Sequence, residues 1–187
     1  MFGHFQILSW VRVVILFTAM TDNVDDKPSV PSTSVELRPD QEPEIRKLVG
    51  VASDKNELLT KRQVALESLG DYHSRSAISC LLDNLLFDEA IVTTSHPLAG
   101  YPAAMSLRRI GSAAYPLVWE RINRECSDKY LFVLAHTIFK IDGKAVALTR
   151  LEEKHKSPDA TKQQIENLAK LLDLFKNTDF KDPKNWP

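Results

Sequence analysis

The chain has 187 residues, of which 43% are hydrophobic and 26% charged, and its formal net charge is −1. This composition is typical of a globular protein and excludes collagen-like, polytopic membrane and wholly disordered chains. The length suits one domain with appendages and is too short for a two-domain enzyme with a separate cofactor module. Two cysteines, Cys80 and Cys126, cannot form a disulfide framework or a closely spaced metal or redox motif, so they leave the redox compartment open.

The first forty residues differ in composition from everything that follows. Residues 1–20 carry one charge, Arg12, and the apolar run over 13–20 has the length of a short signal-peptide core but is too short to span a bilayer. Three interpretations stay open: a signal or membrane anchor in an exported or tethered protein, an untranslated extension of a cytoplasmic protein that starts at Met20, or apolar residues that dock on the domain. Residues 21–40 hold three prolines, several hydroxyl side chains and scattered acids, which predicts a disordered linker. The folded domain is expected over 41–187.

From Gln41 onward, apolar residues recur at steps of three and four with no sustained alternation, so the fold class is predicted to be all-α. A short helix is expected near 42–51, and Ser53 is expected to cap the second helix. A capping helix is expected near 158–177, with an apolar stripe of Ile165, Leu168, Leu172 and Phe175. Glycine, alone or after aspartate, marks three helix stops, at 70, 111 and 142–143. Between the first and last helices the pattern predicts helices over 54–69, 74–87, 101–110, 112–125, 128–141 and 144–156. The second helix is expected to bury Leu58, Leu59, Ala65, Leu66 and Leu69.

These helices form a repeated pair. The hydrophobic residue before each stop recurs after 41 and then 31 positions, and each following helix carries an Ala-x-x-x-Leu pair. Since one helix pair cannot bury its own apolar side, such pairs stack, and small alanines allow the helices to approach closely. The three pairs are Ala77/Leu81, Ala113/Leu117 and Ala147/Leu151.

Over about residues 54–156 this arrangement resembles HEAT repeats of the short HEAT-like type, also seen in phycobilisome lyase subunits. The resemblance implies an α-solenoid, a right-handed stack of about three antiparallel helix pairs with a C-terminal capping helix. It further implies a non-catalytic scaffold for protein–protein interaction, because HEAT units share no catalytic residue. A lyase or chaperone-type subunit that holds a cofactor or a cysteine-bearing partner is the first alternative, and a HEAT-like nucleic-acid binder is the second.

Motifs for catalysis, metal or nucleotide binding are absent from the sequence. There is no glycine-rich phosphate loop and no His-x-x-x-His pair, so no enzyme activity, catalytic residue, cofactor or metal is expected. We interpret His136 as a hydrogen-bonded helix histidine, and Cys80 and Cys126 as buried small hydrophobic residues. The segment 87–100 exceeds the usual length between packed helices and is expected to cover a helix layer, with a ligand-gripping loop as the alternative. At the C-terminus, Phe180 and Trp186 are expected to cap the last helix, with a short exposed motif as the alternative.

Charge is unevenly distributed along the chain. Residues 21–98 hold 14 acids and 8 bases, whereas residues 99–150 hold 4 acids and 8 bases. The basic middle predicts a face that binds an acidic surface of another protein, with an aromatic anchor beside the arginines. The near-neutral total argues against nucleic acid as a partner. An alternative is that the arginines pair with acids of the first repeat and linker, and that Tyr115 and Trp119 belong to the core. The predicted partner-binding residues are Arg108, Arg109, Trp119, Arg121, Arg124 and Arg150.

Overall fold

A computed structural model describes residues 41–87 and 98–185 of the chain, and these residues form helices and turns without a strand. The all-α prediction is therefore confirmed for this part of the protein. The expectations for residues 1–40, for most of the 87–100 segment and for Trp186 lie outside the described residues. The helices are α1 (Glu42–Ser53), α2 (Leu59–Leu69), α3 (Arg75–Asp83), α4 (Pro102–Ile110), α5 (Tyr115–Arg121), α6 (Asp128–His155) and α7 (Lys162–Asn177), with short 3-10 helices η1 (Gly111–Ala114) and η2 (Pro183–Asn185).

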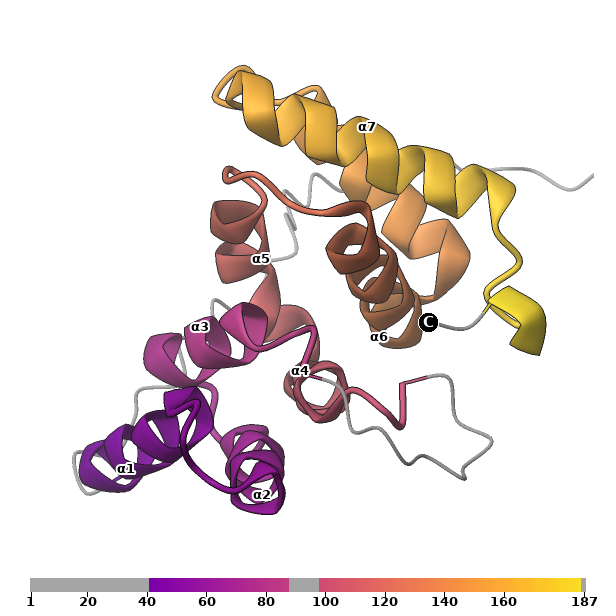
Figure 1. Ribbon diagram of the computed structural model, residues 1–187. Coiled ribbons are helices and arrows are strands. Elements are labelled where there is room, and N and C mark those ends of the chain that lie inside the picture. The colour runs from indigo at the N-terminus through magenta and orange to yellow at the C-terminus, as the bar shows by residue number, and fades with distance from the viewer. Residues whose placement is uncertain (1–40, 88–97, 186–187) are drawn as a thin grey trace, which may run out of the picture. The chain divides into compact units, whose positions relative to one another are not determined.

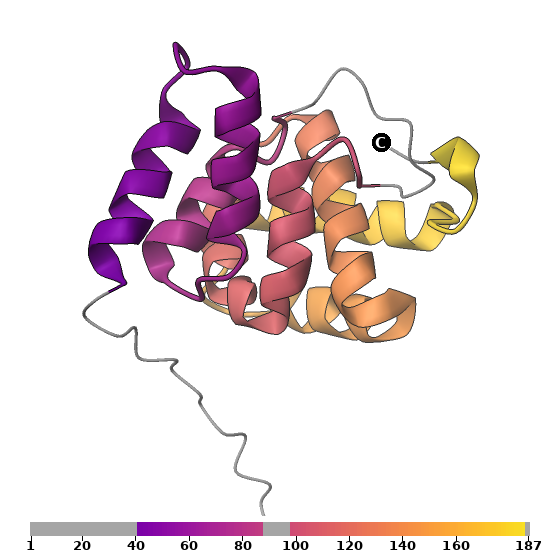
Figure 2. The ribbon, with the colours of Figure 1, turned by 90° about the horizontal axis from the view of Figure 1, so that it is seen from below.

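The helices of the unit that spans residues 35–187 pack as two rows. In one row α2 contacts α4, and α4 contacts α6, so these helices stand side by side in Figure 2. In the other row α1 contacts α3, and α3 contacts α5, while α7 lies along α6 (Figure 1). One continuous apolar core joins the rows. Its fully buried members include Ile45, Leu66, Leu81, Leu107, Leu131 and Phe175.

The start of the second helix differs from the sequence-based prediction. Ser53 does not cap α2; it is the last residue of α1, and its hydroxyl lies 3.7 Å from the sulfur of Cys80. Asp54 instead closes a turn, because its carboxylate accepts the Asn56 backbone N–H at 2.9 Å and its carbonyl accepts that of Glu57 at 3.2 Å. Aspartate favours such local turns over helix continuation, so α2 begins only at Leu59.

This later start changes which leucines the helix buries. Leu58 and Leu59 are each 63% exposed, so the prediction that they belong to the buried stripe is wrong. Leu58 precedes α2 and Leu59 is its first residue, so both lie at the N-terminal end of the helix. The rest of the predicted stripe is buried, at Ala65, Leu66 and Leu69.

The helices after the first and second stops are shorter than predicted. α3 begins where the sequence places the start of this helix, and the Ser74 hydroxyl caps it by accepting the Ala77 backbone N–H at 3.1 Å, but it ends at Asp83. α5 follows the 3-10 turn over Gly111–Ala114 and covers only Tyr115–Arg121. Pro116 therefore lies in the first turn of α5, where a missing N–H costs little.

The third predicted stop is a break in the helical path at Gly143, inside the segment α6. Gly143 has φ 73° and ψ 172°, which breaks the helical path of α6. The Asp142 carboxylate holds this kink, because it accepts the Tyr115 hydroxyl at 2.6 Å and the Arg150 Nε at 2.9 Å. The two predicted helices are thus the two arms of α6, joined where the sequence places the stop.

The three glycine stops serve different physical needs. Gly111 and Gly143 have positive φ, which favours glycine for conformational reasons. Gly70 has an ordinary φ of −66°, but a Cβ there would lie 2.7 Å from the Cβ of Ser106 on α4. Its role is to let the end of α2 approach α4 closely.

Replacing Gly70 by alanine is expected to lower the free energy of unfolding by about 1–3 kcal/mol, because the added methyl group forces α2 and α4 apart. The Gly111→Ala variant should lose a similar amount through backbone strain. Urea unfolding of double variants separates the two causes: Ser106→Gly should offset part of the Gly70→Ala loss and simply add to the Gly111→Ala loss. Additivity in both pairs would contradict the close-approach explanation.

Candidate functional site

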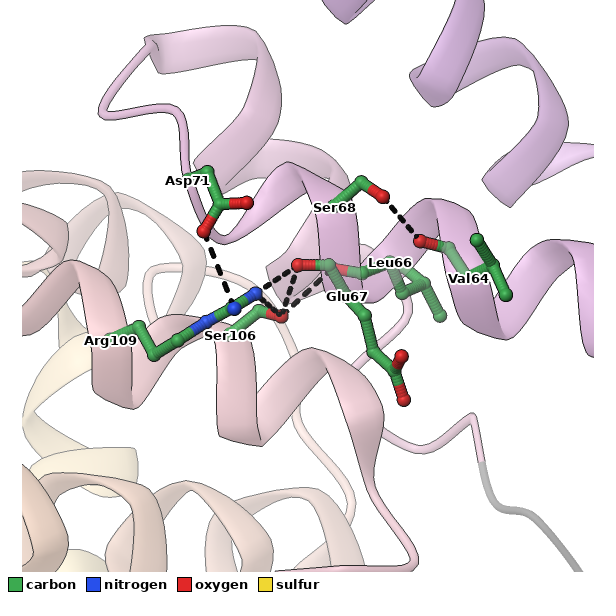
Figure 3. A network of polar contacts seen from close by, with 7 residues as sticks. All are labelled: Val64, Leu66, Glu67, Ser68, Asp71, Ser106 and Arg109. Atoms are coloured by element: carbon green, nitrogen blue, oxygen red, sulfur yellow. Dashed lines mark hydrogen bonds and ion pairs between the residues drawn. The ribbon is translucent and has the colours of Figure 1, made fainter.

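Arg109, one of the predicted partner-binding residues, caps a neighbouring helix. From the last turn of α4 its guanidinium donates to the Glu67 carbonyl and forms an ion pair with Asp71 at 3.3 Å. Beside it, the Ser106 hydroxyl donates to the Leu66 carbonyl at 2.8 Å, as Figure 3 shows. Carbonyls in the last turn of a helix lack partners within that helix. Arg109 and Ser106 therefore attach the end of α2 to α4.

Arg121 and Arg150 are also engaged within the fold. Arg121 lies 3.8 Å from the Asp83 carboxylate, and its guanidinium stacks over the Tyr130 ring at 4.5 Å. Arg150 pairs with Asp142 and stacks over Tyr115 at 4.4 Å from the ring centre. With Arg109, three of the six predicted residues thus pair with acids of the same chain. Arg109 and Arg121 pair with acids of the first predicted repeat, as the alternative from the sequence expects, whereas the partner of Arg150 lies in α6 itself.

The remaining three predicted residues lie at three different places on the fold. Arg108 is exposed and lines a groove of about 650 Å³ with Arg109, between α2 and α4. Arg124 is exposed and lines a polar cavity of about 40 Å³ with Arg121. Trp119 is half-buried and stacks on Tyr115, with ring centres 5.2 Å apart. The structure therefore groups the six as Arg108/Arg109, Arg121/Arg124 and Trp119/Arg150.

His136 has the structural role that its sequence context predicts. Its side chain is fully buried, and Nε2 donates to the Asn185 carbonyl across 2.7 Å. Phe132 and Phe180 pack against its ring with centre distances of 4.9 and 4.8 Å. The other ring nitrogen, Nδ1, has no hydrogen-bond partner among the described residues. Burial lowers the pKa of His136 to about 4, although its bond to Asn185 acts in the opposite direction.

Acidification is expected to destabilise the protein through His136. Because the folded state keeps the ring neutral down to about pH 4 and the unfolded chain protonates it near its ordinary pKa of about 6.5, stability should fall as the pH drops from about 6.5 to 4, by about 3 kcal/mol. Above this window the contribution is constant. Urea unfolding at several pH values should show a steeper fall for the native chain than for His136→Gln, and equal slopes would contradict the assignment.

Both cysteines are buried, as predicted. Burial raises the pKa of the Cys80 and Cys126 thiols, which keeps them protonated and weakly reactive near neutral pH. In the part of the chain that the structure describes, no group of three or more His, Cys, Asp or Glu side chains is placed to hold a metal ion.

A groove of about 860 Å³ lies between the start of α6 and the second half of α7. Its floor is apolar and aromatic, and four charged side chains stand on its walls. Sequence reasoning missed this site. Its lining residues are Tyr101, Asp128, Lys129, Leu131, Phe132, Ala169, Lys170, Asp173 and Leu174.

Two of the four charged side chains of this groove are positioned by the start of α6. The Ser127 hydroxyl accepts the Tyr130 backbone N–H at 3.2 Å and so fixes the first turn, where Asp128 and Lys129 lie. Lys170 of α7 reaches Asp128 at 2.8 Å, and this contact raises the pKa of the lysine. Both partners remain solvent-exposed, so we assign the pair little stability on its own.

The apolar floor is supported from behind by an aromatic cluster. Phe132 of the floor contacts His136, and His136 in turn contacts Phe180. Phe180 also packs on Phe139 and Phe175, with ring centres 5.0 and 4.8 Å apart. The predicted capping by Phe180 is therefore confirmed, and the cap keeps α7 in place along α6.

The groove left only a weak signal in the sequence. Leu174 lies outside the predicted apolar stripe of the last helix, yet it lines the groove, whereas Ile165 of that stripe is 38% exposed. An apolar residue off the main stripe of a helix indicates a second contact surface. Combining Leu174 with Phe132 into one site requires knowing that α6 and α7 are neighbours.

Comparison with protein-family models, curated proteins and solved structures finds no match to this chain. Among the described residues, every helix is too short or too polar to cross a membrane.

Proposed function

We propose that the chain is a non-catalytic interaction scaffold of HEAT-like repeats, and that it binds a partner protein through the groove between α6 and α7. The repeat arrangement is supported by the two rows of helices, because alternate helices are neighbours: α2 contacts α4 and α4 contacts α6 in one row, and α1 contacts α3 and α3 contacts α5 in the other. α7 and Phe180 cover the last pair, as the end of a stack requires.

The observation that carries this proposal is an apolar groove with an exposed charged rim. The Asp128 side chain at the rim is 88% exposed and that of Lys170 is 54% exposed, so the groove opens to solvent. Small-molecule sites usually enclose most of their ligand, which an open groove does not do. A segment of a partner protein gains more binding free energy than a small molecule does, because it covers the whole aromatic floor and its polar side chains contact the charged rim.

Ala169 gives a direct test, because it lines the groove and is exposed, so replacement by a large residue fills the groove without removing core packing. A photo-crosslinking amino acid at position 169 should capture a defined partner segment, identified by mass spectrometry. The Ala169→Arg variant should recover that partner at least fivefold less well, a loss of about 1 kcal/mol or more in binding.

Two controls make this test specific. Ala145→Arg places the same side chain at an exposed position on the other arm of α6 and should leave recovery unchanged. Arg124→Glu tests the basic face expected from the sequence, where an acidic partner would bind. If Arg124→Glu lowers recovery and Ala169→Arg does not, the partner binds the basic face and the groove proposal is wrong.

One observation favours the alternative of a lyase or chaperone-type subunit. That function requires a pocket with converging carboxylates and basic groups, and the groove brings Asp128, Asp173, Lys129 and Lys170 together near Tyr101. Mixing the purified protein with a linear tetrapyrrole and recording its absorption spectrum tests this alternative. A saturable spectral change that Ala169→Arg abolishes would replace the scaffold proposal with a chromophore-holding function.

A further inference from the structure

We propose that the exposed face of α1 and α2 is the interface of a symmetric dimer, in which a second copy of the chain lays its own α1–α2 pair on this face. The interface lies at the end of the helix rows farthest from α6 and does not involve the α6–α7 groove. The apolar character of the face, its place in the rows and its charge balance all favour a second copy as the occupant.

The outer face of α1 and α2 is apolar although solvent reaches it. Val64 is 59% exposed, and Leu58, just before α2, is 63% exposed. A groove of about 350 Å³ lies between the two helices beside these residues. Its lining residues are Leu48, Val51, Thr60, Lys61, Val64 and Ala65. Single exposed apolar residues are ordinary, but a contiguous group of them marks an interaction site, so this face favours a contact that covers it.

The place of this face in the rows indicates that its cover is another helix pair. α3 and α4 have row neighbours on both sides, α1 and α5 for α3, and α2 and α6 for α4. α1 and α2 stand at the end of the rows, drawn in indigo in Figure 2. Because Val64 is exposed, no described helix covers their outer side. Stacked helix pairs bury their apolar sides against the next pair, and the α1–α2 pair of a second copy supplies one.

The charge of this face favours a second copy over a charged partner. Residues 42–69 carry five acids and five bases, and Lys61 of the groove lining pairs with Glu57 at 3.1 Å. Two identical faces carry the same net charge, so a two-fold contact avoids repulsion only where that charge is close to zero. Residues 99–150, with 8 bases and 4 acids, would instead repel a second copy of themselves.

The size of the face implies a weak dimer that depends on concentration. A stable interface takes about 20–30 residues from each partner. α1 and α2 have 12 and 11 residues, and only one side of each can contact the second copy. We therefore expect a dissociation constant of about 10–100 µM. At about 1 µM the chain is then almost entirely monomeric, so stability measured there refers to the single chain.

Sedimentation equilibrium of the full chain between about 1 and 500 µM tests the dimer. The native chain should pass from monomer to dimer and stop there, because a two-fold interface is closed. Val64→Glu puts a charge into the apolar contact and should raise the dissociation constant about tenfold or more. Val146→Glu is the matched control, because Val146 lies on α6, is 52% exposed and should tolerate the same change without effect. Urea unfolding at about 1 µM should give both variants similar midpoints, which separates lost association from lost folding.

Crosslinking tests where the two copies meet. Cys80 and Cys126 are buried, so the new thiol of a Val64→Cys variant is the one that a short bis-maleimide reaches. A two-fold axis near Val64 brings the two copies of this residue close together. The Val64→Cys variant should therefore give a covalent dimer at concentrations above the dissociation constant, whereas the control variant Val146→Cys should give little.

Several outcomes would overturn the inference. These are a chain that stays monomeric up to about 500 µM, association that continues beyond the dimer, association that Val64→Glu leaves intact, and equal crosslinking of the two cysteine variants. A monomeric chain whose Val64→Cys thiol resists a maleimide would mean that another segment of the chain covers the face. Ala169→Arg should leave the dimer unchanged, so the dimer and the proposed α6–α7 partner site can fail separately.

Discussion

Replacing Leu81 by alanine is expected to lower the free energy of unfolding by about 2–5 kcal/mol. Leu81 lies in α3 with its side chain fully buried. α3 contacts α1, α4 and α5, so a cavity at this position weakens the packing between the two rows of helices. Urea unfolding followed by circular dichroism measures the loss, with the slope of the transition as a check that the unfolded state is unchanged.

The control for this prediction is the same substitution at Leu59, which the sequence pattern had assigned to a buried stripe. Leu59 is 63% exposed, so Leu59→Ala should change stability by no more than about 0.5 kcal/mol. Equal losses at Leu81 and Leu59 would mean that the register of α2 and α3 differs from the one described.

Replacing Phe180 by alanine is expected to cost about 3–5 kcal/mol. The Phe180 ring is buried and packs against the rings of His136, Phe139 and Phe175. Its removal leaves a cavity behind the groove floor and frees the segment that follows α7. Chemical denaturation measures the stability loss, and limited proteolysis should show earlier cleavage after α7.

Two further variants test whether the loss at Phe180 comes from lost apolar packing. Phe180→Leu keeps most of the apolar volume and should lose clearly less stability than Phe180→Ala. Ile165→Ala, at a 38% exposed position on the same helix α7, should lose little. A small loss for Phe180→Ala would contradict the role of Phe180 as the cap of the stack.

The sequence pattern predicted the helices well because their apolar residues and stop signals act locally. Ser74, Gly111 and Gly143 each begin, end or kink a helix where the pattern placed them. The failures came from competing local bonds and from tertiary contacts. Asp54 closes a turn that delays α2, and the closeness of Ser106 explains Gly70, which its backbone angles alone do not.

The candidate site was less predictable than the fold. The arginines were singled out because they cluster in the sequence, but Arg109, Arg121 and Arg150 find acidic partners that lie 38, 38 and 8 positions away along the chain. The groove depends on two helices whose contact residues, such as Phe132 and Leu174, are separated by more than 40 positions in the sequence. Apart from the Arg150–Asp142 pair inside α6, these contacts do not follow from periodicity, because they depend on which helices become neighbours.

The tight approach at Gly70 has an evolutionary consequence. An added Cβ at position 70 would collide with the side chains of both Ser106 and Arg109, so in related chains a larger residue at position 70 should occur together with changes at positions 106 and 109. An added Cβ at Gly111 or Gly143 would have no atom within 4 Å, so these glycines are favoured only by their positive φ angles. They should therefore vary independently of any distant site.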